Sequence, residues 1–154
     1  MRYWLMKSEP STYSVDDLRA RPRQTDCWDG VRNYQARNML RDEIRPGDLA
    51  FFYHSSCAEP GIVGIMKITG AGRPDPTAFD PGDQHYDPES SPTAPRWYMV
   101  EVRLERKLKR TITLTELKRC PELSGLPLLK RGNRLSVMPV EAKHWKFILS
   151  LLPV

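Results

Sequence analysis

The chain has 154 residues, of which 40% are hydrophobic and 28% charged, and its formal net charge is +5. This length suffices for one domain with its own hydrophobic core, so we expect a single domain over residues 1–154. No apolar run reaches the roughly 20 residues of a membrane span. The first residues also lack the apolar stretch of a secretory signal. We therefore expect a protein that is not secreted and has no membrane partner, cytoplasmic in a bacterium or nuclear in a eukaryote.

The first elements are a strand and a short helix. Residues 1–7 are rich in aromatic and branched side chains, which predicts a strand. It should end at Ser8-Glu9-Pro10, because proline lacks a backbone donor and biases the preceding residue away from helix. Ser14 and the two aspartates that follow Val15 predict a capped helix over 14–18. We interpret residues 19–26 as a polar connector.

Residues 27–37, CWDGVRNYQAR, put an indole, a carboxylate, guanidinium groups, amides and a phenol side by side. A structural turn needs only Gly30, with Asn33 as the cap of the helix predicted over about 34–41. Aromatic faces beside planar hydrogen-bonding groups are typical of sites for a flat polar ligand such as a nucleobase. The alternative is that Trp28 simply anchors this loop to the core.

Two strands and a long loop follow. Residues 49–54 are almost continuously apolar, which indicates a strand buried on both faces, and 62–69 should pair with it as a hairpin. Residues 70–95 contain six of the 14 prolines and show no periodic pattern. Their aromatic side chains argue against simple disorder, so we expect a long ordered loop.

The last third predicts two more strands and two helices. Residues 96–110 alternate between apolar and polar, as in a long strand, and Thr113 with Glu116 forms a capping-box pattern for a short helix. Residues 133–138 predict a strand, and Pro139 should start the final helix. Together these elements predict an α+β domain, a small and partly open mixed β-barrel of five to six strands with short peripheral helices.

Positive charge is concentrated in the C-terminal part. Residues 1–100 carry 12 basic and 14 acidic residues, whereas 101–154 carry 12 and 5. Such clusters commonly bind phosphates, although a short basic run can also be no more than a solvated face. The candidate contacts to a nucleic-acid backbone are Arg106, Lys107, Lys109, Arg110, Lys130, Arg131 and Arg134.

Neither a metal nor a cofactor is expected. The three cysteines lie far apart, which argues against a disulfide framework and a thiolate metal site. The three histidines also stand in unlike contexts. One feature supports an enzyme, because His54 and Cys57 lie three positions apart and could form a thiol nucleophile with its base.

Four segments resemble the EVE domain, a family that includes the thymocyte nuclear protein group and is related to PUA and YTH domains. They are YWLMKSEP from Tyr3, WDGVRNYQAR from Trp28, GDLAFFYHSS from Gly47 and GNRLSVMP from Gly132. The resemblance extends over nearly the whole chain. It implies a PUA-like β-barrel that binds nucleic acid and holds a modified base in an aromatic-lined pocket.

A weaker resemblance to YTH domains implies that Lys7-Ser8, Trp28 and Asn33 surround this base. Glu9 could accept from an exocyclic amine or pair with Arg32, and Asn33 could instead only cap its helix. His54 follows a strand toward the pocket, where it could contact ligand or satisfy the loop backbone. The candidate pocket residues are Lys7, Ser8, Glu9, Pro10, Trp28, Arg32, Asn33, Tyr53, His54 and Ser55.

These inferences predict a monomeric, non-enzymatic module that binds DNA or RNA carrying a methylated or otherwise 5-substituted base. Two alternatives remain open. One is a small thiol hydrolase that uses Cys57 and His54, and the other is a PUA-type binder of structured RNA that flips no base.

Overall fold

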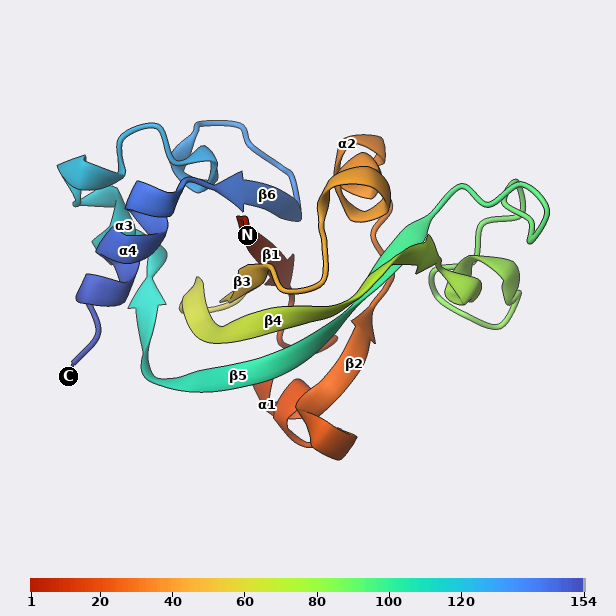
Figure 1. Ribbon diagram of the computed structural model, residues 1–154, viewed down its shortest axis with the longest axis horizontal. Helices are drawn as coiled ribbons and strands as arrows, with labels where there is room; N and C mark the ends of the chain where they lie inside the picture. Colours follow the sequence, from red (N-terminus) through yellow and green to blue (C-terminus); the bar gives the residue numbers. More distant parts are fainter. Residues whose placement is uncertain (154) are drawn as a thin grey trace.

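The computed structural model describes residues 1–153 and is built on one six-stranded mixed sheet of order β2-β5-β4-β3-β1-β6. β1 runs parallel to β3, and the other neighbouring pairs are antiparallel. The curved sheet stays open, because β2 and β6 do not pair with each other within residues 1–153 (Figure 1). The strands are β1 Tyr3–Ser8, β2 Thr25–Trp28, β3 Leu49–His54, β4 Gly61–Pro74, β5 Tyr98–Thr113 and β6 Val137–Val140.

Short helices surround the sheet, as the sequence predicts for an α+β fold. Ser14 and Asp17 form the expected capping box at the start of α1, and the Thr113 hydroxyl caps α3. No helix among residues 1–153 has the length and apolar character needed to span a membrane. The α-helices are α1 Val15–Arg19, α2 Tyr34–Asn38, α3 Leu114–Lys118 and α4 Ala142–Ser150; a π-helical turn, Met39–Glu43, extends α2, and 3-10 turns cover Pro22–Gln24, Pro76–Phe79, Pro121–Leu123 and Pro127–Leu129.

Both faces of the central strands are buried, which explains their continuous apolar sequence. Successive side chains of a strand point to opposite faces. Accordingly Trp4 belongs to a core that α1 and α2 cover, whereas Leu5 belongs to a second core that includes residues of α3 and α4. Figure 1 shows α3 and α4 together at one end of the molecule and segment 75–97 at the other.

The two ends of the sheet differ from the predicted elements. β2 was expected as connector and loop. Only Trp28 of its four residues is buried in the structure, so its sequence carries no alternating apolar pattern. It pairs with β5, where Trp28 lies opposite Val100. β6 begins later than predicted and contains Pro139, which was expected to start α4. Proline is tolerated there because β6 is an edge strand.

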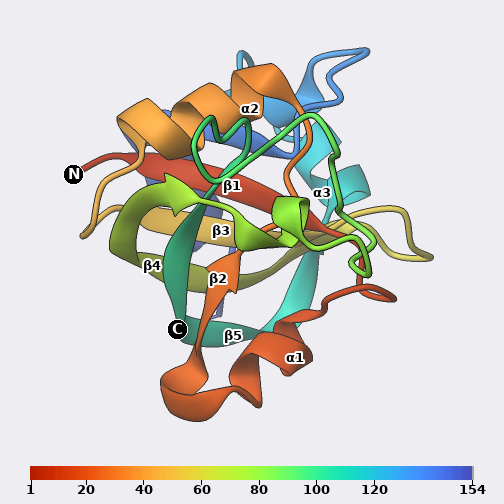
Figure 2. The same cartoon turned by 90° about the vertical axis from the view of Figure 1, so that its right-hand side faces the viewer.

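Segment 75–97, between β4 and β5, is the predicted ordered loop; it begins later than expected because β4 extends to Pro74, and it ends two residues later because β5 begins at Tyr98. It runs beside α2 and β2 (Figure 2). Trp97 stacks on Tyr34 of α2 with 4.9 Å between ring centroids, and its indole N–H donates to Asp87 at 2.7 Å. Arg37 donates to the backbone carbonyl of Arg96 at 2.7 Å. These contacts hold the loop against the domain.

Candidate functional site

A cavity of about 490 Å³, hereafter the small cavity, lies where the ends of β1 and β2 meet segment 75–97. Pockets of this size suit small flat ligands. Five of the predicted pocket residues line it: Lys7, Ser8, Glu9, Trp28 and Arg32. The remaining lining residues are Thr12, Tyr13, Asp26, Cys27, Asp29, Gly30, Val31, Gln84, His85, Val102 and Ser136.

Trp28 serves both the core and the cavity. It is 7% exposed and packs edge-on against Phe52, with ring centroids 5.1 Å apart and planes at 76°. Edge-to-face pairs of this kind add stability beyond the burial of their area. The two interpretations offered by the sequence are therefore compatible, since a buried indole still lines the wall where a base would stack.

Gly30 makes the turn that follows β2. Its φ of +76° lies in the left-handed region that favours glycine, and its N–H donates to the Asp75 carboxylate at 2.8 Å. A Cβ atom at this position would lie 2.6 Å from the His85 ring. The close approach brings His85, a residue of the distant proline-rich loop, into the cavity wall.

Arg32 holds segment 75–97 in place. Its guanidinium donates to the backbone carbonyl of His85 at 2.7 Å, to Asp75 at 3.0 Å and to the hydroxyl of Thr77 at 3.2 Å. It also lies over the Trp97 ring, 5.4 Å from the centroid. The expected alternative pairing of Arg32 with Glu9 is therefore wrong, because the ion partner of Arg32 is Asp75.

Asp75 is fully buried, and burial alone would raise its pKa. Hydrogen bonds from Thr77, Gly30 and Arg32 outweigh this effect and hold the pKa of Asp75 below its ordinary value. The carboxylate thus stays ionised and ties the turn after β2 to the loop that follows β4.

Several polar atoms of the small cavity are engaged within the protein. The Ser8 hydroxyl donates to the backbone carbonyl of Tyr13 at 2.6 Å, and the Tyr13 phenol donates to Asp26 at 2.5 Å. Burial and this bond to Asp26 raise the pKa of Tyr13. Asp26 also accepts from the Cys27 N–H at 2.8 Å. These groups shape the wall, and a ligand would have to compete for them.

Lys7 and Asp29 carry charges that are not engaged in this way. Within residues 1–153 neither side chain takes part in a hydrogen bond or ion pair, although the Lys7 ammonium lies over the Tyr53 ring, 5.8 Å from its centroid. Burial lowers the pKa of Lys7. Burial, followed by the nearby Asp75 carboxylate, raises the pKa of Asp29. Asp29, next to Trp28 in the chain, thus lines the small cavity as a carboxylate with no protein partner among the described residues. The Lys7 ammonium instead lies over a ring of the core that faces α3 and α4, on the other face of the sheet from Trp28.

Five predicted pocket residues lie outside the lining of the small cavity: Pro10, Asn33, Tyr53, His54 and Ser55. The Asn33 side chain accepts from the N–H of Ala36 at 3.0 Å, as the cap of α2. Tyr53 is buried in the core that faces α3 and α4. The Ser55 N–H donates to the backbone carbonyl of Ser8 at 3.0 Å, so Ser55 holds the backbone of a residue that lines the cavity.

His54 has a structural partner rather than a catalytic one. Its Nε2 accepts from the Val15 N–H at 3.1 Å at the start of α1, and burial lowers its pKa. No hydrogen bond joins it to Cys57 in the part of the chain that the structure describes. Over the same residues, no group of three or more His, Cys, Asp or Glu side chains is placed to hold a metal ion.

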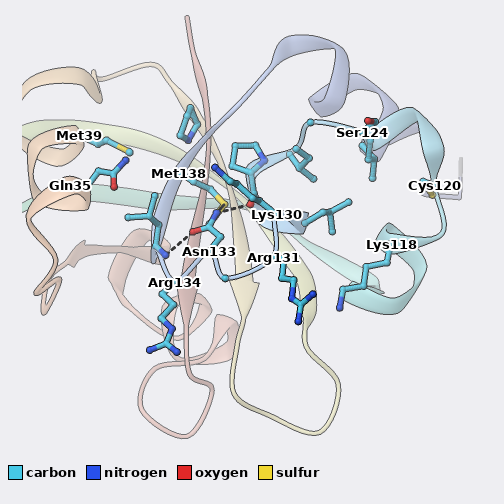
Figure 3. A pocket seen from close by; sticks show the side chains of 18 of the residues that line it. Gln35, Met39, Lys118, Cys120, Ser124, Lys130, Arg131, Asn133, Arg134 and Met138 are labelled. Atoms are coloured by element: carbon cyan, nitrogen blue, oxygen red, sulfur yellow. Dashed lines mark hydrogen bonds between the residues drawn. The ribbon is translucent and has the colours of Figure 1, made fainter.

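A larger depression of about 1,100 Å³, hereafter the basic groove, lies among α2, α3 and the segment before β6. Its cations are Lys118, Lys130, Arg131 and Arg134, no acidic residue lines it, and within residues 1–153 none of the four forms an ion pair. In Figure 3 the side chains of Lys118, Arg131 and Arg134 extend to the same side. The apolar floor includes Leu123, Leu126, Leu129, Leu135, Met138 and Pro139.

The groove and the small cavity are neighbours. Arg32 lines the cavity and Asn33 the groove, and Ser136 lines the cavity and Leu135 the groove. Asn133 shapes the wall of the groove, since its amide donates to the Pro127 carbonyl at 2.6 Å. The two depressions are therefore lined by residues that follow one another directly in the chain at two places.

The basic run on β5 is partly neutralised. Lys107 pairs with Asp16 at 2.6 Å, and Arg110 pairs with Glu116 at 2.7 Å. Within the described residues Arg106 and Lys109 form no ion pair. The four groove cations are thus more available to an anion than Lys107 and Arg110 of this run.

Residues 2–151 match the family model of the EVE domain. The chain belongs to this family. Among its relatives, thymocyte nuclear protein 1 of Homo sapiens is 47% identical and that of Danio rerio 49%, over 97% and 96% of this chain and 73% and 71% of those proteins. An uncharacterised Schizosaccharomyces pombe protein is 44% identical over 97% of this chain and 68% of its own length.

Solved structures agree with the EVE, PUA-like fold. A Pseudomonas syringae protein, 48% identical, superposes with a TM-score of 0.91 over 97% of this chain and 98% of its own. Human THYN1 protein in complex with 5-methylcytosine-containing DNA, 46% identical, also has a TM-score of 0.91, over 98% of this EVE chain and 97% of its own. A Zymomonas mobilis ASCH protein at 9% identity and a TM-score of 0.57 shares the fold alone.

Sequence reasoning missed the contribution of segment 75–97 to the site. His85 and Gln84 line the cavity from this loop, and no spacing in the sequence indicates that they meet Gly30. Asp29 was visible as a carboxylate beside Trp28, but only the structure shows that it is free of protein donors among the described residues.

Proposed function

We propose that this EVE domain is a non-enzymatic module that binds nucleic acid and holds a modified base, in the first place 5-methylcytosine, in the small cavity. One observation carries the proposal: a cavity lined by Trp28, Lys7 and Asp29 opens beside a groove of four cations. A relative with a TM-score of 0.91, solved with 5-methylcytosine-containing DNA, supports the choice of ligand.

In this proposal the base leaves its stack and enters the cavity, where the Trp28 wall covers its face. The backbone on one side of the flipped nucleotide then crosses the basic groove. Its phosphates contact Lys130, Arg131, Arg134 and, in addition to the sequence-based candidates, Lys118. Arg106 and Lys109 of β5, which form no ion pair among the described residues, are further candidate phosphate contacts, whereas Lys107 and Arg110 would have to leave their acidic partners.

The protein works without cofactor in this proposal, as a monomer that binds one modified site. The vertebrate relatives are named nuclear proteins; for this chain we propose a compartment that contains nucleic acid, the cytoplasm of a bacterium or the nucleus of a eukaryote. The same cavity could accept a modified base from RNA, so the test includes both polymers.

The test is a fluorescence titration with duplexes that differ only in one 5-methylcytosine or cytosine, repeated with the matching RNA. Ser136→Phe fills the cavity without removing a side-chain hydrogen bond, and Ser11→Phe is its control at an exposed site outside the lining. We expect Ser136→Phe to lose about five- to 150-fold in affinity for the methylated site, the range of a single base stacked on an aromatic.

Binding to the unmodified duplex should be unchanged in both variants, because phosphate contacts supply it. Equal affinity of the wild type for modified and unmodified DNA and RNA would overturn the proposal. A loss of preference in Ser11→Phe equal to that in Ser136→Phe would do so too, since the effect would then not belong to the cavity.

A further inference from the structure

Several polar groups lining the small cavity form neither a hydrogen bond nor an ion pair within residues 1–153: the side chains of Lys7, Glu9, Thr12, Asp29, Gln84 and Ser136, and the Trp28 indole N–H. Two of them are carboxylates. Ionised carboxylates only accept hydrogen bonds, and an ammonium only donates. Glu9 and Asp29 are therefore the candidate acceptors of the cavity, whereas the Lys7 ammonium lies over the Tyr53 ring on the other face of the sheet from Trp28.

The backbone on both sides of Asp29 is held in place. Trp28, immediately before it, is buried and paired with Val100 in the sheet. Gly30, immediately after it, is fixed by its N–H bond to Asp75 and by contact with the His85 ring. Asp29 and Glu9 are both exposed, and the backbone of Glu9 is also hydrogen-bonded, to Thr12 and Tyr13. Asp29 differs in its place, directly between Trp28 and Gly30 in the cavity wall. A group that reads one edge of a base needs a fixed position, and Asp29 has one.

The environment of Asp29 disfavours its ionised form. Although part of the residue is exposed, burial of the carboxyl and the Asp75 carboxylate raise its pKa. Asp26 and Asp83 act in the same direction, and His85 acts against them. An acid whose pKa is raised on folding reduces stability at neutral pH, and this loss disappears as the pH falls through the folded-state value. Such groups are concentrated at functional sites.

Resting on the proposed function, we propose that Asp29 reads the exocyclic amine of a cytosine-type base in the small cavity. Cytosine presents an amine donor at C4 beside the N3 and O2 acceptors. Thymine has the same ring and 5-methyl group but presents an oxygen acceptor at C4 and a donor at N3. A carboxylate accepts from the cytosine amine and repels the thymine oxygen. Asp29 is then the residue that separates two bases of nearly equal shape.

The experiment compares single-stranded oligonucleotides that carry one 5-methylcytosine or one thymine at the same position and no other thymine. Wild type, Asp29→Asn and Glu9→Gln are titrated with both, and their melting temperatures are measured at neutral pH. We expect the wild type to prefer 5-methylcytosine about 10- to 150-fold, the range for a hydrogen bond to a charged group. Asp29→Asn should reduce this preference to within a few-fold, because an amide can also donate to the thymine oxygen. Glu9→Gln should keep it.

The melting temperature separates a reading role from a structural one. Asp29→Asn should melt at the wild-type temperature or above it, since it removes a carboxylate held in an unfavourable environment. A preserved preference in Asp29→Asn, or its loss in Glu9→Gln, would overturn the assignment of Asp29 while leaving base binding in the cavity intact. A wild type that binds both oligonucleotides no better than one with unmodified cytosine in their place would instead overturn the proposed function and this inference together.

Discussion

At the scale of single residues, Trp28 combines packing in the core with a place in the wall of the small cavity. The indole is 7% exposed and its edge meets the Phe52 ring, yet the same residue lines the small cavity. We expect Trp28→Ala to lower the free energy of unfolding by about 3–5 kcal/mol, as for other large aromatic truncations in a core. Binding to modified and unmodified DNA should both weaken as the fold is lost.

Denaturant unfolding of wild type, Trp28→Ala and Trp28→Phe measures this effect. Trp28→Phe keeps an aromatic ring against Phe52 and should lie between the other two. An unfolding free energy of Trp28→Ala within 1 kcal/mol of the wild type, a gap smaller than about a third of the cost expected for a core tryptophan, would show that the indole belongs to the cavity alone.

The sequence places the candidate residues on the right segments but does not decide the use of each polar group. Asn33 and His54 are polar residues at the ends of elements, where a cap and a ligand contact have the same residue preferences. In the structure both side chains accept hydrogen bonds from backbone N–H groups: Asn33 from that of Ala36, and His54 from that of Val15. A helix cap and a ligand contact can be told apart only by the hydrogen-bond partner of the side chain. A partner that lies far away along the chain cannot be identified from a single sequence.

At the scale of elements, the site depends on segment 75–97 being fastened to the turn after β2. Asp75 makes this connection. Its pKa lies below its ordinary value because Thr77, Gly30 and Arg32 donate hydrogen bonds to its carboxylate. A depressed pKa contributes stability that is present above the unfolded-state value and is lost as the pH falls through the folded-state value. The loop should therefore loosen in acid.

We expect the wild type to lose stability as the pH drops below about 4, the ordinary value for aspartate. Asp75→Asn should be less stable at neutral pH and show a shallower dependence over the same range. Melting curves from pH 7 to pH 3, with hydrogen exchange of segment 75–97, measure both. Asp42→Asn is the control, because Asp42 is exposed and its hydrogen bonds come from Arg41 next to it. Parallel pH curves for Asp75→Asn and wild type would contradict the role of Asp75.

Elements with a strong local pattern agree with the sequence, and those without one do not. β3 was predictable because its residues are buried on both faces, and α1 because Ser14 and Asp17 form its cap. β2 has four residues and one buried side chain, so nothing local distinguishes it from a loop. It becomes a strand because β5 offers a free edge from Val100 to Arg103.

At the scale of the whole molecule, the open sheet brings the small cavity and the basic groove together. The two depressions share a border formed by consecutive residues, Arg32 with Asn33 and Leu135 with Ser136. The EVE resemblance predicted the fold over nearly the full chain. Which basic residues are free to contact phosphates could not be predicted from the sequence. Lys107 and Arg110 pair with acidic residues that lie elsewhere along the chain, whereas the groove cations have no such partner among the described residues.

The last prediction compares the two basic surfaces by the salt dependence of binding. Each phosphate contact contributes about 0.9 to the slope of log affinity against log salt for duplex DNA and about 0.7 for single strands. Charge reversal of Lys130, Arg131 and Arg134 should therefore lower the slope by about 2–3 and weaken binding to modified and unmodified DNA alike. The small cavity is untouched, so the ratio between the two affinities should survive.

Two variants serve as controls for net charge. Reversing Lys107 and Arg110 should change the slope little, since both already face acidic groups, and reversing the exposed Lys146 of α4 tests a cation outside both depressions. A slope that falls with the β5 pair and not with the groove would assign the backbone path to β5. Slope changes that follow only the number of charges reversed, whichever surface they lie on, would mean that only the total charge of the molecule attracts nucleic acid and that the groove has no special part in binding.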